Sequence, residues 1–193
     1  EDLSVLGFHR FFFSTHYKSE LIKDYFGDGS KWSITIRYIE EESPLGTAGA
    51  LSLLPRQEID HPILMMNADL YTKADFHNLI EFHSVNNNYI TVCARNHEVQ
   101  IPFGTIESDG KKILDIKEKP TYQYLINAGI YVLNLEVLDS LDNNQYLDMP
   151  TLIKKAIDKK KKISWYPILE YWRDIGAINE LKVARMDKEN GRI

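Results

Sequence analysis

The sequence is short of the residues that build disulfide frameworks, cysteine-rich metal sites and membrane spans. Its 193 residues include one cysteine, Cys93, which excludes an internal disulfide and a cysteine-rich zinc site. The longest apolar runs, such as residues 63–66, are far too short to cross a bilayer. No charged segment followed by an apolar one opens the sequence, so we expect a cytoplasmic protein that binds no membrane.

The sequence also has no excess of basic over acidic residues. Lysine and arginine number 23 against 28 acidic residues, giving a net charge of −5, so we expect no nucleic-acid partner. The basic run at residues 159–162 suits a helix C-terminus. Neither glycine-rich phosphate-loop signature occurs, and no G-x-S-x-G element offers a serine nucleophile. The six histidines show no metal-binding spacing.

What the chain does contain is ordinary for a folded domain. Hydrophobic residues make up 44% and charged residues 26%, and eight Phe, eleven Tyr and three Trp supply the bulk of a core. No repeat, low-complexity tract or linker divides the sequence. We therefore expect residues 1–193 to form a single domain.

Strand and helix patterns alternate along the chain. The periodicity predicts strands at 9–14, 33–39, 62–66, 89–94, 128–133 and 163–168, helices at 18–26, 46–54, 75–85, 149–159 and 177–186, and a hairpin at 105–118. The apolar run 62–66 is typical of a central strand covered on both faces. This order predicts an α/β three-layer sandwich with a mixed, mostly parallel sheet. Ligands of such sheets bind beyond the carboxyl ends of the strands.

Two aspartates follow strand-like segments and are candidates for that position. Asp69 comes directly after the run 62–66, and Asp174 also follows a strand-like stretch and precedes a helix. Magnesium is held by one or two carboxylates together with substrate phosphates, so a pair of strand-end aspartates suits it. The alternative is that Asp69 lies in a turn and Asp174 caps a helix.

Two further segments carry polar groups suited to a phosphorylated ligand. Glu118-Lys119-Pro120 ends the hairpin, where the lysine suits a phosphate and the glutamate suits sugar hydroxyls; the alternative is a solvated turn. The small residues of segment 46–50 open a helix and leave backbone N–H groups accessible to an anionic or planar ligand. Close helix packing explains the same small residues equally well.

Taken in order, these pieces resemble the sugar-1-phosphate nucleotidylyltransferases, in particular the mannose-1-phosphate guanylyltransferase-like branch. The similarity runs from about residue 7 to 186, and its Rossmann-like fold is the fold expected for this chain. The matching segments are residues 25–29, 44–51, 66–69, 103–104, 118–120, 127–131 and 172–176. Each segment is weak evidence alone, and seven of them in the family's order are strong evidence.

The resemblance implies roles for individual residues. It places the two catalytic Mg²⁺ aspartates at Asp69 and Asp174. Sugar-phosphate contacts fall on Gly104, Glu118, Lys119 and Asn127, and nucleobase contacts fall on Glu41, Pro44 and Gly46. The implied reaction is attack of a sugar 1-phosphate on the α-phosphorus of a nucleoside triphosphate with release of pyrophosphate. Guanine is favoured, because the carboxylate of Glu41 suits the two donors on one edge of that base; the alternative is that residues 40–42 form a solvated acidic turn.

Residues 1–193 also depart from the family pattern. The family's first strand, with its glycine-rich loop and arginine that cradle the triphosphate, has no counterpart, so the fold is expected to be N-terminally truncated, with the first βα unit absent. We expect an uncovered inner strand and therefore a homodimer, and no useful turnover by this chain alone. Ala68 also stands where the family usually has glycine, which restricts the backbone.

Two other functions fit the sequence. One is a non-catalytic homologue that binds a sugar phosphate or nucleotide sugar as a regulatory subunit, which the missing loop favours. The other is a glycosyltransferase that uses a nucleotide sugar, whose sheet and strand-end aspartate are similar. Segments 44–51 and 118–120 favour the nucleotidyltransferase over the glycosyltransferase.

Overall fold

A four-stranded sheet forms the centre of the molecule. The computed structural model describes residues 2–192, and the strands follow the order β3 (Ile63–Met66), β8 (Thr121–Leu133), β5 (Ile90–Gln100) and β9 (Ile163–Pro167). β3, β5 and β9 share one direction and β8 runs against them. The mixed, mostly parallel sheet is confirmed. β8 is reversed because it follows β5 through a hairpin, not through a crossover helix.

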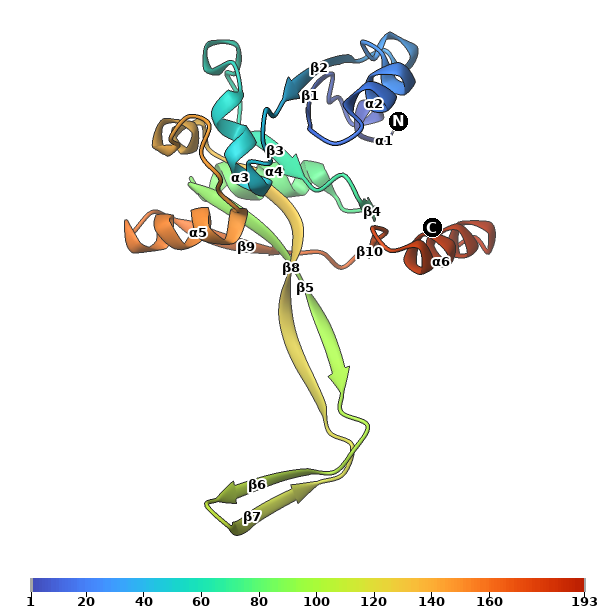
Figure 1. Cartoon of the computed structure of the whole chain (residues 1–193), viewed down its shortest axis with the longest axis vertical. Helices are drawn as coiled ribbons and strands as arrows, with labels where there is room; N and C mark the ends of the chain where they lie inside the picture. The colour runs from blue at the N-terminus through green and yellow to red at the C-terminus, as the bar shows by residue number, and fades with distance from the viewer. Residues whose placement is uncertain (1, 193) are drawn as a thin grey trace.

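Helices cover both faces of this sheet, as the three-layer prediction requires (Figure 1). On β8, Ile130 and Val132 point to the side of α4 (Phe76–Val85), where they share a core with Leu79. Tyr131 and Leu133 point the other way, to a core shared with α5 (Met149–Asp158). The period of two along a strand therefore divides the core into two apolar layers. The elements completing the second layer are α3 (Gly46–Gly49), η2 (Ala50–Leu53) and η4 (Leu135–Ser140).

Smaller elements surround the centre. β1 (Arg10–Thr15) and β2 (Thr35–Glu40) form a separate parallel pair, joined through α2 (Ser19–Phe26). β4 (Leu70–Thr72) pairs antiparallel with β10 (Trp172–Asp174), and α6 (Ile178–Glu189) follows. The remaining short helices are α1 (Asp2–Val5), η1 (Ser30–Trp32) and η3 (Arg56–Glu58). Across the described residues, no helix is long and apolar enough to cross a membrane.

The position of β3 corrects one expectation. Within residues 2–192, β3 pairs with β8 alone, so it lies at the edge of the four-stranded sheet, and each of its residues is partly exposed. A continuous apolar run on an edge strand is unusual, because such runs are typical of strands covered on both faces. The separate β1–β2 pair and the free edge of β3 match the expected uncovered strand.

β5 and β8 correct a second expectation, because both run beyond the body as a long two-stranded arm (Figure 1). The predicted strands 89–94 and 128–133 account only for the half inside the body. The outer half pairs residues 95–100 with 121–126. At the far end, β6 (Thr105–Asp109) and β7 (Lys112–Lys117) form the predicted hairpin, which turns through Gly110 at φ +56°.

Side-chain caps fix where the two main helices begin. Asp75 accepts a hydrogen bond from the backbone N–H of Asn78 at 3.0 Å, and Asp148 accepts one from Thr151 at 2.9 Å. Each aspartate thereby satisfies a donor that the first turn of a helix leaves without a partner. α2 ends at Gly27, at φ +55°, in agreement with the sequence prediction.

Candidate active site

The short β4–β10 ladder brings Asp69 and Asp174 together. Asp69 follows the end of β3, and its carbonyl accepts a hydrogen bond from the backbone N–H of Ile175 at 2.7 Å. Asp174 lies directly opposite Leu70 in the ladder. Backbone hydrogen bonds thus hold together two segments that lie more than 100 residues apart in the sequence. Each segment carries an exposed aspartate where the two meet.

Gly176 occupies the space between the two carboxylates. A Cβ at this position would lie 2.9 Å from Oδ2 of Asp69 and 3.2 Å from Oδ1 of Asp174. Asp174 Oδ1 also accepts a hydrogen bond from the Gly176 N–H at 2.9 Å. Because only a hydrogen atom stands there, the two oxygens face a common space that any larger side chain would fill.

This carboxylate pair fits a magnesium ion that shares its coordination with a substrate. Mg²⁺ prefers oxygen ligands and keeps several waters, so it is bound by one or two carboxylates and substrate phosphates. Within the described part of the chain, no group of three or more His, Cys, Asp or Glu side chains is arranged to hold a metal on its own. Two convergent carboxylates suit an ion that arrives with a phosphorylated ligand better than a permanently bound structural metal.

Asn127 is held by two side-chain hydrogen bonds near the segment that leads to Asp69. Its Nδ2 donates to the hydroxyl of Tyr131 at 2.7 Å, and its Oδ1 accepts from the N–H of Gly129 at 3.0 Å. Gly129 has φ +70°, and a Cβ there would lie 2.9 Å from Nδ2 of Asn67. The N–H of Asn67 in turn donates to the Gly129 carbonyl at 3.0 Å. Asn127 and the segment leading to Asp69 are therefore locked to each other.

Arg95 and Trp172 support the site, and the sequence analysis missed both as individual residues. Nη1 of Arg95 donates to the Trp172 carbonyl at 2.9 Å, and its guanidinium lies 5.2 Å from the centre of the indole ring. The indole Nε1 donates to the Ala128 carbonyl at 2.8 Å. These contacts tie β10 to the base of the arm. Arg95 is a single arginine one residue beyond a predicted strand, so the sequence carried no signal for it.

The remaining sugar-phosphate candidates lie elsewhere. Gly104, Glu118 and Lys119 are exposed residues at the junction of the arm and its terminal hairpin, away from the body that carries Asp69 and Asp174 (Figure 1). A Cβ on Gly104 would lie 3.1 Å from Oε2 of Glu118, so these two residues are in close contact. Lys119 has φ +45°, a left-handed conformation that a lysine rarely adopts. Within one chain the metal and sugar-phosphate candidates therefore form two separate groups, one on the body and one on the arm.

The nucleobase candidates take part in internal contacts. One carboxylate oxygen of Glu41 accepts from the Ser14 hydroxyl, and the other accepts from the backbone N–H of Leu45 at 2.7 Å. Glu41 therefore shapes the loop that carries Pro44 and Gly46.

The segment after this loop supports the packing alternative. The N–H groups of Ala48 and Gly49 both donate to the Leu147 carbonyl at 2.9 Å, so they are not free for an anionic ligand, contrary to that expectation. A Cβ on Gly46, which has φ +75°, would lie 2.7 Å from the same carbonyl. These residues are small because the chain before α5 approaches them closely.

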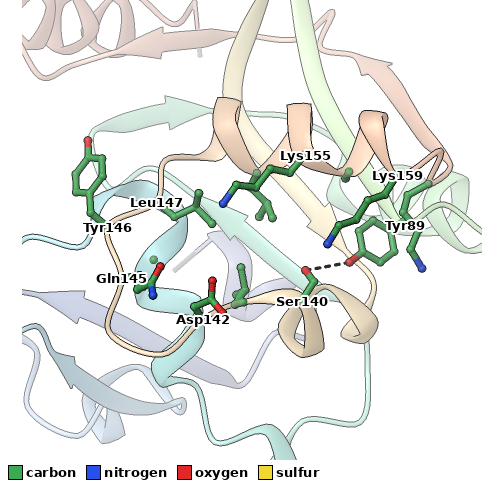
Figure 2. A pocket seen from close by; sticks show the side chains of 13 residues that line it. Tyr89, Ser140, Asp142, Gln145, Tyr146, Leu147, Lys155 and Lys159 are labelled. Carbon is green, nitrogen blue, oxygen red and sulfur yellow. Dashed lines mark hydrogen bonds between the residues drawn. The ribbon is translucent and has the colours of Figure 1, made fainter.

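A small hollow lies beside α5, and Gly49 and Leu147 form part of its wall. It measures about 40 Å³ and is lined by Tyr89, Ser140, Asp142, Lys155 and Lys159 among others (Figure 2). The Tyr89 hydroxyl donates to Ser140 Oγ at 3.2 Å across its wall. This volume holds a water or two and excludes a nucleotide.

The sequence is similar to known sugar-phosphate nucleotidyltransferases. It is 29% identical to mannose-1-phosphate guanylyltransferase of Mycobacterium tuberculosis over 182 residues, covering 91% of this chain and 50% of that protein. It is 26% identical to D-glycero-alpha-D-manno-heptose 1-phosphate guanylyltransferase of Aneurinibacillus thermoaerophilus, covering 97% of this chain and 82% of that protein. The chain spans about half the length of the mannose-1-phosphate enzyme.

Solved structures agree on the fold. The crystal structure of HddC from Yersinia pseudotuberculosis complexed with GMP-PN superimposes with a TM-score of 0.69 at 20% sequence identity, covering 94% of this chain and 80% of that chain. The family model described as nucleotidyl transferase matches residues 1–191, nearly the whole sequence. This chain therefore belongs to the nucleotidyl transferase family.

Proposed function

We propose that this protein transfers a nucleoside monophosphate from a nucleoside triphosphate to a sugar 1-phosphate and releases pyrophosphate. The observation that carries the proposal is the meeting of Asp69 and Asp174 around Gly176, in a chain of the nucleotidyl transferase family. GTP is the favoured donor, because the relatives from M. tuberculosis and A. thermoaerophilus are both named guanylyltransferases. The reaction belongs to the synthesis of nucleotide sugars.

In this proposal Asp69 and Asp174 would hold the Mg²⁺ ion. The ion supplies neutralisation of phosphate charge, which phosphoryl-type transfer needs more than covalent help. Other candidate residues would position the sugar. Asn127, fixed by Tyr131 and Gly129, offers an amide edge, and Glu118 and Lys119 offer an acceptor and a cation for the hydroxyls and phosphate. Alignment of the attacking oxygen is the main contribution expected from these side chains.

The test is pyrophosphate release by the natural protein that carries this sequence, over its whole length. GTP, ATP, UTP and dTTP are each offered with Mg²⁺ and a panel of hexose and heptose 1-phosphates. We expect release with at least one sugar and the highest rate with GTP. The absence of pyrophosphate with every pair, together with measurable binding of a sugar phosphate, would favour the second candidate, a non-catalytic regulatory subunit. The family match leaves the glycosyltransferase alternative without support.

Residues 1–193 tested by themselves are expected to give little turnover. They contain no glycine-rich loop with an arginine, so the triphosphate lacks a cradle of backbone N–H groups and a cationic clamp. The same assay on this stretch measures the difference, and robust release would show that such a loop is dispensable. The cytoplasmic location stays a prediction, which fractionation of cells expressing the whole tagged protein would test.

A further inference from the structure

The strand β10, which carries Asp174, depends on contacts outside its own ladder. The β4–β10 pairing joins three residues to three, and an isolated two-stranded ladder is at best marginally stable in water. Trp172 fixes one side of β10 through its indole N–H and its contact with Arg95. Successive side chains of a strand alternate between its two sides, so Arg173 points away from Trp172 and Asp174. The contacts of Arg173 therefore show what holds the second side.

Arg173 is held by α6, the helix that follows β10. Its Nη1 donates to Oε2 of Glu180 at 2.5 Å, and its Nε donates to the hydroxyl of Tyr171 at 3.1 Å. Its Nη2 lies 3.5 Å from Oδ2 of Asp187. The Tyr171 hydroxyl in turn donates to the same oxygen of Asp187 at 2.9 Å. Arg173, Tyr171 and Asp187 therefore form a closed triangle of contacts between α6 and the start of β10.

Tyr171 extends this triangle to β4. Its carbonyl accepts from the backbone N–H of Lys73 and from the hydroxyl of Thr72, both at 2.9 Å. Its ring packs edge to face on that of Tyr71 in β4, with the ring centres 5.9 Å apart. Tyr71 is also the residue opposite Arg173 in the ladder. Both strands of the ladder are therefore attached to the same group of side chains.

Asp187 is the buried charge in this group. It is 6% exposed, and the two buried residues of α6 are Ala184 and Asp187. Nη1 of Arg192 lies 3.2 Å from its Oδ1, so each carboxylate oxygen has a cationic partner. A buried ion pair often adds little stability compared with packed apolar side chains, whereas it restricts how the elements that it joins are arranged. Its position between α6 and β10 therefore indicates a role in orientation.

We propose that Asp187 is a positioning residue for the metal site: through Tyr171 and Arg173 it holds β10 so that the carboxylate of Asp174 meets that of Asp69. Its own polar contacts within the described residues are to Tyr171, Arg173 and Arg192, so it acts through them. The inference rests on the proposed function, because it takes the two aspartates as the Mg²⁺ ligands. It makes α6 a determinant of metal affinity.

The first test is Mn²⁺ binding by the whole natural protein without substrate, read from the relaxation of water protons. Mn²⁺ replaces Mg²⁺ because it takes the same oxygen ligands. Asp187→Asn keeps the size of the side chain and removes its charge. We expect the dissociation constant for Mn²⁺ to rise by about tenfold, the lower end of the range for partners that orient metal ligands. Asp174→Asn identifies the part of the signal that belongs to this site.

Two further variants make the test specific. Tyr171→Phe removes only the hydroxyl that joins Arg173 to Asp187, so it should also weaken Mn²⁺ binding, and it serves if Asp187→Asn does not fold. Glu189→Gln is the matched control, because it removes one negative charge from an exposed position of the same helix. It should bind Mn²⁺ as the natural protein does. Thermal unfolding shows that each variant is folded at the temperature of the titration.

The Mg²⁺ dependence of pyrophosphate release separates orientation from folding. A loss of folded protein lowers kcat at every Mg²⁺ concentration, whereas a misplaced Asp174 raises the Mg²⁺ concentration that gives half the maximal rate. We expect Asp187→Asn to need about tenfold more Mg²⁺ and to recover most of kcat at saturation. A lower kcat at an unchanged Mg²⁺ requirement would overturn the proposal.

The Mn²⁺ titrations decide the proposal without turnover. Weaker binding by Asp187→Asn and Tyr171→Phe, with normal binding by Glu189→Gln, supports it. Normal Mn²⁺ affinity in either of the first two variants, when folded, would overturn it. Equal weakening by Glu189→Gln would also overturn it, because net charge would then explain the effect. A protein that releases no pyrophosphate would contradict the proposed function, whereas these titrations would still report on Asp187.

Discussion

At the scale of single residues, the burial of His83 makes the stability of the fold depend on pH. His83 is a buried residue of α4, and its Nδ1 lies 2.9 Å from the hydroxyl of Thr91, which also accepts from Asn88. Burial lowers the pKa of the His83 imidazole below its usual value. The unfolded chain therefore takes up this proton first as pH falls. Stability from the neutral imidazole is fully present above about pH 6.5 and is lost as pH falls toward the folded pKa.

The prediction is that the free energy of unfolding declines between about pH 7 and 5, and that His83→Gln flattens this decline. The measurement is thermal unfolding across that range. His77→Gln is the matched control, since His77 is an exposed histidine of the same helix. An equal decline in the two variants would show that other groups set the pH dependence.

Glu41 carries the prediction on base preference. Glu41→Gln keeps an oxygen for the Leu45 N–H and offers the Ser14 hydroxyl an amide group, so the loop should keep its shape. If the carboxylate also reads guanine, the variant should lower the preference for GTP over UTP by roughly tenfold, the equivalent of one lost charge-assisted contact. Relative kcat/KM for the two nucleotides measures this. An unchanged ratio at normal stability would make Glu41 a loop-shaping residue only.

At the scale of elements, periodicity predicted the helices and the body strands because each buries one side. Leu79 of α4, and the alternation of Ile130, Tyr131, Val132 and Leu133 in β8, reflect contact with a core. The arm was missed because it has no core of its own. The outer half of β5 begins with Asn96-His97-Glu98, which places polar side chains on both faces of the strand. Tyr122 and Tyr124 alternate on the other strand and were the signal that could have found it.

The candidate site was also only partly predictable from the sequence. Asp69 and Asp174 could be named from strand ends and a family resemblance, since both cues are local. The antiparallel ladder that joins them pairs segments far apart in the sequence, and no local pattern specifies it. Gly176 and Arg95 owe their positions to that pairing. The separation of Lys119 from the carboxylates followed from the length of β8, which the sequence analysis underestimated.

The N-cap of α5 gives a prediction for one element. Asp148→Ala removes the acceptor for the N–H of Thr151 and should lower the free energy of unfolding by about 1 kcal/mol. Denaturant titration measures the change. Asp158→Ala, at the last residue of the same helix, is the control and should change stability less, because the residue lies at the negative end of the helix dipole. A loss for Asp158→Ala as large as that for Asp148→Ala would contradict a capping role.

At the scale of the whole molecule, the body and the arm have different tasks. The body packs two apolar layers around a mixed sheet and fixes the carboxylate pair through β4 and β10. The arm carries an exposed apolar face and the cation that the proposed reaction needs. The free edge of β3 and the separate β1–β2 pair add unpaired strand edges, which proteins ordinarily cover. Each of these features is consistent with a chain that works within a larger assembly.

The most direct test of this account is pyrophosphate release by the whole natural protein with Asp69→Asn or Asp174→Asn. Loss of a direct ligand should cost more than the roughly 10–100-fold typical of outer-shell partners, so we expect each variant to fall by over about 100-fold in kcat/KM. Asp24→Asn, an exposed aspartate of α2, should keep full activity. Near-normal release by both Asp69→Asn and Asp174→Asn would contradict the account.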